Sequence, residues 1–201
     1  KGQSGPFNFR THPNAMAHLV ETGFNLFSLA NNHSMDYGPE GLADTRAVLD
    51  KAGIRHAGAG RNATEARQPA YMMADGVTVA ALAYSLTFPE EFWAGPDKPG
   101  TAFGHEKHVR ADVAAARTTA DIVVVSFHWG QEGKTELRDY QVQLGRAAID
   151  AGAVAVLGHH PHILQAIERY RDGVILYSLG NFTFGSYSKQ AQVSAVAELV
   201  F

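Results

Sequence analysis

The chain of 201 residues contains no cysteine, which excludes disulfide bridges and thiolate metal sites. Any metal ion must therefore be held by oxygen atoms and imidazole nitrogens. The chain also has little net charge, formally -3 at pH 7. Its surface as a whole offers no electrostatic attraction for nucleic acid or for an anionic membrane. We expect no nucleic acid among its partners.

The sequence also lacks a run of eighteen apolar residues, and its first residues do not resemble a signal peptide. It does not begin with Met, and it ends inside an alternating apolar run. That run, residues 193–201, predicts a strand whose partner lies beyond the end. We therefore expect a piece of a longer polypeptide, extended upstream of Lys1 and past the C-terminal end.

Histidine is the enriched functional residue type. The chain has ten histidines against four methionines and two tryptophans, and several histidines stand close together. The hydrophobic fraction of 45% over 201 residues is enough for one substantial core. We expect a single domain that spans residues 1–201.

Helical and strand patterns alternate along the chain. Apolar residues at helical spacing, bounded by proline or glycine, predict helices over residues 13–22, 39–52, 108–119 and 138–151. Continuous apolar runs predict buried strands over residues 24–29, 122–127 and 153–157. Asp75-Gly76 and Asp172-Gly173 predict antiparallel hairpins. This order predicts an α/β fold with two packed sheets flanked by helices.

Residues 85–104 are rich in proline and glycine and contain Phe88, Phe92 and Trp93. We expect an excursion loop here. Long connections without secondary structure are uncommon inside compact domains and tend to be functional. The aromatic side chains either cap a substrate cleft or pin the loop to the core, and the sequence leaves both readings open.

Polar clusters follow the ends of three predicted buried strands, at residues 30–38, 128–132 and 158–162. Loops at the carboxyl ends of strands gather into sites in α/β proteins. Each cluster alone has an ordinary explanation in turns, packing or solvated surface groups. Together they deliver imidazoles to one sheet edge, the arrangement that a metal site needs when thiols are absent.

Pro161 separates His160 from His162. Residues two apart in an extended stretch point the same way, so both imidazoles can reach one metal or two adjacent metals. His159 should face the opposite side. We expect it to be a supporting or structural residue rather than a ligand.

Four ordered segments resemble the CapA, or PGA_cap, family of poly-γ-glutamate capsule proteins, within the calcineurin-like metallophosphoesterase superfamily. They are SLANNHSMDYG (residues 28–38), SFHWGQE (126–132), GHHPH (158–162) and YSLGNF (177–182). The resemblance covers nearly the whole chain. It implies a metallophosphatase-like four-layer sandwich, with two mixed sheets between helices.

The resemblance also implies roles for individual residues. The superfamily's Gly-Asn-His motif supplies a metal-ligating asparagine and a histidine that acts near the scissile bond, which correspond to Asn32 and His33. Two later motifs supply further ligands, which correspond to His128, His160 and His162. The aspartate-bearing motifs with which the superfamily begins are not visible in residues 1–9. Their absence favours a native polypeptide that extends upstream.

The implied cofactor is a pair of divalent metal ions, such as Mn, Fe or Zn, and the sequence leaves the metal identity open. Two such ions would polarise a phosphoryl or carbonyl oxygen and lower the pKa of a bound water. His33, beside the ligand Asn32, would protonate the leaving group or stabilise the charge that builds on it.

Three further polar residues have two readings each. Asp36 either orients His33 or caps the helix that begins near Pro39, and capping is the favoured reading. Glu132 is either an outer carboxylate that holds a histidine tautomer or a solvated loop charge. Asn181 either meets the substrate or forms a turn with Gly180.

Three functions fit these expectations. The first is a metal-dependent, phosphoesterase-like hydrolase of capsule or cell-envelope polymer metabolism, whose polymer link rests on the resemblance alone. The second is a non-catalytic accessory protein of a capsule synthesis or export complex. The third is metal-assisted amide or peptide chemistry, such as hydrolysis or epimerisation.

The resemblance also suggests partners and a location. The substrate would be an anionic polymer, a phosphoester or a peptide-like molecule, and the protein partners would be membrane proteins of capsule synthesis. The location would be the cell envelope, at the outer face of the membrane or in the periplasm. No signal or anchor stands in these residues.

Overall fold

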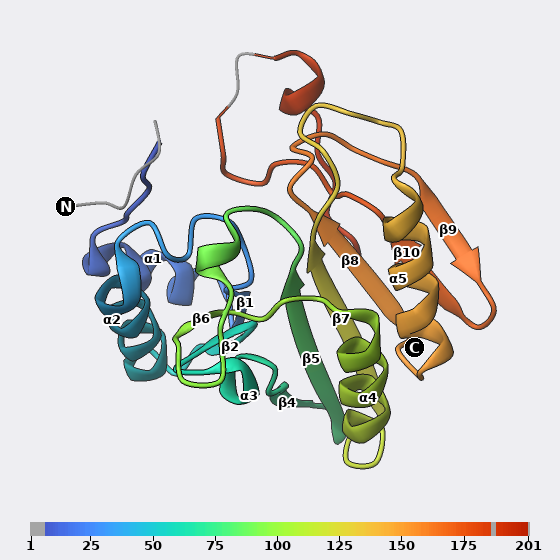
Figure 1. Cartoon of the computed structure of the whole chain (residues 1–201), viewed down its shortest axis with the longest axis horizontal. Coiled ribbons are helices and arrows are strands. Elements are labelled where there is room, and N and C mark those ends of the chain that lie inside the picture. Colours follow the sequence, from blue (N-terminus) through green and yellow to red (C-terminus); the bar gives the residue numbers. More distant parts are fainter. Residues whose placement is uncertain (1–6, 186–187, 201) are drawn as a thin grey trace.

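A six-stranded mixed sheet forms the centre of the molecule. The computed structural model describes residues 7–185 and 188–200 (Figure 1). The sheet order is β4-β5-β7-β8-β10-β9. The bounds are Ala70–Ala74 (β4), Val77–Ser85 (β5), Ile122–His128 (β7), Ala155–His159 (β8), Ile167–Tyr170 (β9) and Gly173–Leu176 (β10). The inner strands run parallel, and the edge strands β4 and β9 are antiparallel to their neighbours.

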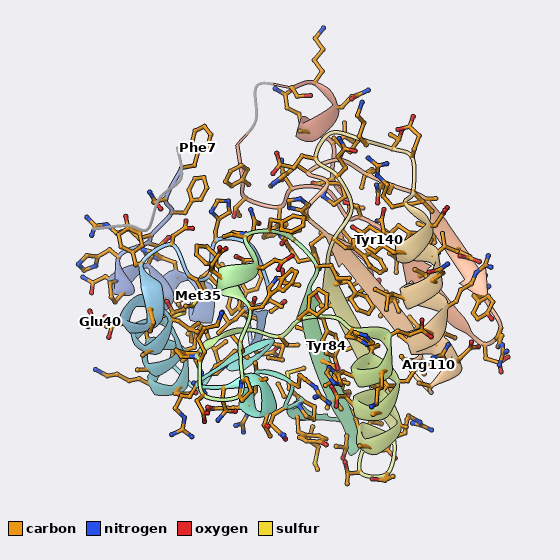
Figure 2. The ribbon with its side chains drawn as sticks, viewed as in Figure 1. Phe7, Met35, Glu40, Tyr84, Arg110 and Tyr140 are labelled. Atoms are coloured by element: carbon orange, nitrogen blue, oxygen red, sulfur yellow. The ribbon has the colours of Figure 1, made fainter. Side chains whose placement is uncertain are left out.

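Two helices cover one face of this sheet (Figure 1). They are α4 (Glu106–Ala116) and α5 (Asp139–Asp150), and they supply the crossovers that parallel neighbours need. Because side chains alternate along β5, Leu82 and Tyr84 share a face and pack with Val109 of α4 in the main core (Figure 2). The largest apolar cluster of the protein therefore lies on this side.

A second, two-stranded sheet covers the opposite face. It pairs β1 (Leu26–Ser28) with β2 (Arg55–Ala57) in parallel. Ala83 of β5 lies one position from Leu82 and Tyr84, so it points away from α4. It packs in a small cluster with Ala30, Ala57 and Ala70. The two sheets therefore meet through alanines, whose small side chains allow a close approach.

Helix α2 (Gly38–Lys51) packs on the outer side of the two-stranded sheet. Its Leu42 and Leu49 join Leu29 and Ile54 in a third apolar cluster. The layers are therefore helices, six-stranded sheet, two-stranded sheet and helix. This order confirms the predicted four-layer α/β class.

Residues 85–104 are more ordered than the predicted excursion loop. They contain η2 (Glu90–Phe92) and β6 (Gly100–Thr101), and β6 pairs with β3 (Ala59–Gly60). Phe92 is buried, and Trp93 stacks on Phe103 with ring centroids 4.1 Å apart. These contacts favour the reading in which the aromatic side chains pin the segment to the core. Phe88 is the exception, because it is 72% exposed.

Both predicted hairpins are confirmed. Asp75 and Gly76 join β4 to β5 with φ angles of 50° and 82°, the pair of left-handed residues that a type I′ turn requires. The second hairpin joins β9 to β10 through Arg171, with φ 50°, and Asp172. The hydrophobic runs on either side of each turn therefore pair as the sequence indicates.

The strand predicted for residues 193–201 is wrong for the part that the structure describes. Residues 193–200 are not in a strand, and Val196 and Val200 are 82% and 88% exposed. The segment is tied to the sheet region by a 2.9 Å hydrogen bond from the Ala195 N–H to the Leu179 carbonyl oxygen. An alternating pattern needs a neighbouring strand, and none of the described strands pairs with it. Residue 201 lies outside the described residues.

The remaining elements are short. They are η1 (Pro13–Ala15), α1 (Met16–Glu21), α3 (Ala63–Ala66) and η3 (Gln190–Gln192). The helix predicted for residues 13–22 is thus divided between η1 and α1. Within the described ranges, every helix falls short of the length and apolar character that crossing a bilayer requires.

Candidate metal site

The site forms where the ends of β1, β7 and β8 come together. β7 and β8 are parallel neighbours with His128 opposite His159, so the loops after them start side by side. Alternation along β7 places Phe127 on the helix side of the sheet, which turns His128 toward the two-stranded sheet. There, His128 Nε2 lies 2.8 Å from Oδ1 of Asn32, which follows β1 and is 96 positions away in sequence. The predicted ligands therefore meet between two layers.

A tight turn after β1 presents Asn32 and His33. The Asn31 side chain accepts a 2.8 Å hydrogen bond from the His33 backbone N–H. The Ser34 hydroxyl donates to the carbonyl oxygen of Leu29. Local bonds of this kind are typical of Asx and Ser/Thr turns, which compete with helix formation. They hold both residues at the carboxyl end of β1.

Asp36 orients His33. Its Oδ2 lies 2.9 Å from His33 Nδ1 and accepts a 2.9 Å hydrogen bond from the Phe9 backbone N–H. Because a carboxylate only accepts, the ring proton is on Nδ1, and Nε2 remains for another partner. Helix α2 begins after Tyr37 with no side-chain cap. The favoured prediction that Asp36 caps this helix is therefore wrong, since its 5% exposed carboxylate is turned toward His33 instead.

The segment around Pro161 is not extended as predicted. His160 and His162 have φ angles of 96° and 59°, in the left-handed region that residues other than glycine seldom adopt. Such backbone strain is maintained mainly at functional sites. The ring centroids of His160 and His162 are 6.1 Å apart, and that of His160 is 4.8 Å from that of His128. The imidazoles therefore meet through two left-handed residues rather than through strand alternation.

Asn181 contacts His162, a contact that neither of its predicted roles included. Its Oδ1 lies 2.7 Å from His162 Nδ1, and its amide nitrogen donates to the Ala191 carbonyl oxygen at 3.2 Å. The second bond sets the orientation of the amide, so Oδ1 accepts the proton on Nδ1. His162 therefore keeps Nε2 for a metal, as in many sites where an outer group fixes the tautomer.

Glu132 lies in the loop after β7, close to the same histidines. One ligand-type atom from each of Glu132, His160 and His162 lies within 4.8 Å of the other two. Glu132 is exposed, whereas the two histidines are partly buried. His159 ends β8 opposite His128 and is not a member of this group. The loop after β7 therefore brings a carboxylate to the loop after β8.

Burial keeps several of these imidazoles uncharged. It is the main cause that lowers the pKa of His128 well below its ordinary value, and nearby His160 adds to the effect. Burial lowers the pKa of His160 to about 4 and also lowers the pKa of His159. His33 contributes to the lowered pKa of both His128 and His160, which places it beside them. Neutral imidazole is the form that binds a metal.

The donor set fits divalent metal ions. Within the part of the chain that the structure describes, His160 Nδ1 is buried and has no hydrogen-bond partner, which is rare for a polar atom without a further role. Imidazole nitrogens, the Asn32 carboxamide and the Glu132 carboxylate, with no thiolate, suit Mn, Fe or Zn. Asn32, His128, His160 and His162 are the predicted ligands, and the structure brings these four together.

Two phenylalanines that the sequence did not single out cover the site. The Phe9 ring meets His33 edge-on at 4.6 Å, and the Phe184 ring lies 5.3 Å from His162. The two phenylalanine rings are 5.5 Å apart, and they are 44% and 50% exposed. Nothing in the local sequence signals this contact, because it joins segments from opposite ends of the chain.

Comparison with known proteins places these features in a family. The model described as "Bacterial capsule synthesis protein PGA_cap" matches residues 1–186. The chain is 37% identical over 192 residues to the "PGA biosynthesis protein CapA" of Bacillus subtilis (strain 168), covering 95% of this chain and 50% of that protein. It is 34% identical over 187 residues to a "Probable polyglutamine synthesis accessory protein" of Mycobacterium tuberculosis (strain H37Rv), covering 88% and 49%. The chain thus spans about half the length of these relatives.

A solved structure shares the fold. It is that of a "5'-nucleotidase precursor" from the bacterium Thermus thermophilus, with a TM-score of 0.54 and 18% sequence identity. The match covers 82% of this chain and 34% of that chain. At this level of identity the likeness concerns architecture alone.

Proposed function

Because the chain belongs to the bacterial capsule synthesis protein PGA_cap family, we propose that it is a metal-dependent hydrolase, phosphoesterase-like in mechanism, of capsule or cell-envelope polymer metabolism. One observation carries the proposal. Asn32, His128, His160 and His162 meet at one edge of two packed sheets, beside the paired side chains of His33 and Asp36. Metal ligands next to an oriented acid are the components that metal-assisted hydrolysis needs.

The four predicted ligands would hold two divalent ions between the layers. When bound, such ions supply Lewis-acid chemistry and make water a better nucleophile at neutral pH. Burial keeps His128 and His160 neutral and ready to bind. Asn181 fixes the tautomer of His162 through the 2.7 Å contact with its Nδ1. These residues therefore bind and orient the reacting groups.

His33 would give a proton to the leaving group. Asp36 occupies Nδ1 of its ring, which leaves Nε2 free to take up a proton from solvent and then give it to the leaving group. The Phe9 backbone N–H steadies the same carboxylate oxygen of Asp36. A histidine oriented in this way is a suitable general acid near neutral pH.

Metal content and turnover together test this function. The full-length protein loaded with Mn, Zn or Fe should hydrolyse p-nitrophenyl phosphate or bis-p-nitrophenyl phosphate. His128→Ala and His160→Ala should each lose bound metal, measured by elemental analysis, whereas His159→Ala should keep it. Equal metal content in all three variants would contradict the ligand assignment. Cleavage or epimerisation of γ-glutamyl peptides, without phosphoester hydrolysis, would favour amide chemistry instead.

A second function is favoured by the name of one relative, the "Probable polyglutamine synthesis accessory protein". In this reading the chain keeps the metal and assists membrane proteins of capsule synthesis in the cell envelope, at the outer face of the membrane or in the periplasm, without turnover. Pull-down from envelope extracts discriminates the two. Recovery of synthesis proteins by a metal-loaded but inactive protein would support the accessory role.

A further inference from the structure

Glu132 brings a carboxylate from the loop after β7 to two histidines of the loop after β8. Ligand-type atoms of Glu132, His160 and His162 all lie within 4.8 Å of one another. Resting on the proposed metal dependence, we propose that Glu132 is a direct metal ligand. With His160 and His162 it forms a three-ligand site that holds one cation by itself, while Asn32 and His128 serve a second ion.

The hydrogen bonding of the histidines argues against an outer, supporting role for Glu132. A supporting carboxylate accepts a hydrogen bond from the ring nitrogen that faces away from the metal. On His162 that position is taken by Asn181, 2.7 Å from Nδ1. On His160, neither ring nitrogen makes a hydrogen bond to Glu132 among the described residues, and Nδ1 is buried without any partner there. Glu132 therefore holds neither tautomer among the described residues, and its carboxylate is available for a cation.

Hydrogen bonds of the surrounding backbone hold Glu132 in this place. The backbone N–H of Gly133 donates to the Pro161 carbonyl oxygen at 2.9 Å. The Gln165 side chain donates to the Lys134 carbonyl oxygen at 2.8 Å. These bonds tie the loop that carries Glu132 to the loop that carries the histidines. The juxtaposition thus belongs to the fold and does not depend on the glutamate side chain.

The distances come close to those of one shared ion. Two atoms bound to the same cation at about 2.1 Å are at most about 4.2 Å apart. The 4.8 Å limit of the group is close to this value. The Glu132 side chain is exposed, so rotation of its torsions can shorten the distances from its carboxylate to the two histidines without moving the backbone.

The chemistry of the three ligands indicates the class of cation. Two imidazoles and one carboxylate form sites for Zn²⁺ and Fe²⁺, with open positions for water or substrate. Mg²⁺ and Ca²⁺ prefer oxygen ligands throughout. The three-ligand site should therefore take a borderline divalent ion in preference to Mg²⁺.

A thiolate placed at this position tests direct ligation. The wild-type chain has no cysteine, so Glu132→Cys introduces the one thiol of these residues. Co²⁺ added to the full-length variant should produce a near-ultraviolet thiolate-to-cobalt charge-transfer band, which arises only when sulfur bonds to the metal. Glu136→Cys, an exposed residue of the same loop, is the matched control and should give no band.

Further variants define the site. In the Glu132→Cys background, His162→Ala should raise the Co²⁺ concentration needed for the band at least tenfold, whereas Asn32→Ala should leave it within twofold. Glu132→Gln should lower the affinity for the first Zn²⁺ at least tenfold by calorimetry. A Glu132→Cys protein that binds Co²⁺ without the band would overturn the proposal, as would a band that depends on Asn32 as strongly as on His162.

The outcome is separable from that of the proposed function, because the band is read without turnover. A protein that shows the band and hydrolyses nothing supports the ligand assignment and removes the hydrolase. A protein that hydrolyses phosphoesters with unchanged Zn²⁺ affinity in Glu132→Gln keeps the hydrolase and removes Glu132 from the ligands.

Discussion

The two sides of the metal site differ in the packing that supports them. His128 ends β7, and His160 and His162 follow β8; both are inner strands of the six-stranded sheet, backed by the largest apolar cluster. Phe127 and Trp129, on either side of His128, are wholly buried. A ligand on such a scaffold is held close to its working position before any ion binds.

The side of the site that carries Asn32 and His33 has less packing behind it. Asn32 and His33 follow β1, a strand of three residues in a two-stranded sheet. Behind it lies a smaller cluster around Leu42 and Leu49 of α2. The comparison teaches that the two sides of the candidate site have unequal support. We expect the side that carries His33 to open first when the protein is stressed.

Replacing one buried side chain on each side with alanine should have the largest effect and tests this difference directly. Trp129 stacks on Phe127 with ring centroids 4.5 Å apart and donates to the Tyr177 carbonyl oxygen. Trp129→Ala should lower the free energy of unfolding by about 3–5 kcal/mol, and Leu42→Ala by about 2–3 kcal/mol, in urea titrations. An equal or larger loss for Leu42→Ala would show that both sides are equally well supported.

Crowding the junction between the sides should have the next largest effect. A Cβ on Gly58, which has φ 92°, would lie 2.6 Å from Ala30 Cβ and 2.8 Å from Ala83 Cβ. Gly58→Ala should cost about 2–4 kcal/mol through overpacking and backbone strain, and it should weaken metal binding by moving Asn32 away from His128.

Gly76→Ala is the matched control for this substitution. Gly76 has φ 82° but nothing within 4 Å of an added Cβ, so it reports the backbone strain alone, about 1 kcal/mol. Equal losses of unfolding free energy in the two variants would show that the alanine contacts do not set the spacing of the sheets.

Removing the carboxylate charge of Asp36, which orients His33, should lower turnover without changing the amount of bound metal. Asp36→Asn should lower kcat about 10- to 100-fold, because the amide group can turn its NH2 toward the ring nitrogen and favour the other tautomer of His33. Bound metal, measured by elemental analysis, should stay unchanged, because Asp36 is outside the ligand group. Asp44→Asn, on an exposed position of α2, should leave kcat unchanged. Loss of metal in Asp36→Asn would mean that the two sides are not separable.

Acid should lower the free energy of unfolding by a small amount, through the contacts of Glu65 with α2. Burial by itself raises the pKa of Glu65. Hydrogen bonds from Arg61 and from Arg46, which is in α2, outweigh this effect and lower the pKa from 4.5 to about 2. A lowered pKa means that this stabilisation is present above pH 4.5 and is lost as the pH falls toward 2. We expect about 1 kcal/mol or less after solvent screening, seen as a flatter pH dependence of urea unfolding in Glu65→Gln.

The strand ends could be predicted because their signals are local. Buried apolar runs followed by polar clusters indicated where Asn32, His128 and His160 would emerge, and the turn residues Asp75 and Gly76 indicated a hairpin. These features depend on neighbours within a few positions. For the same reason the strand expected for residues 193–201 was wrong, since a pattern of alternation says nothing about whether a partner strand is present.

The sequence could not decide which partners the polar side chains choose. Asp36 turned toward His33 rather than the start of α2, and Asn181 toward His162 rather than a turn with Gly180. Asp36 and His33 are three positions apart in one loop, whereas Asn181 and His162 come from different loops. Short-range preferences for capping and turns favoured the wrong partner for Asp36.

The sequence by itself determined which chemical groups are available and at which strand ends they emerge: imidazole, carboxamide and carboxylate in place of thiolate. Only the tertiary structure decided which of them meet. Strand order placed His128 beside His159, the alanine contacts between the sheets brought Asn32 to His128, and the left-handed backbone at His160 turned its ring into the site. The physical reason is that donor types and strand ends follow from local chain preferences, whereas their convergence follows from the packing of layers far apart in sequence.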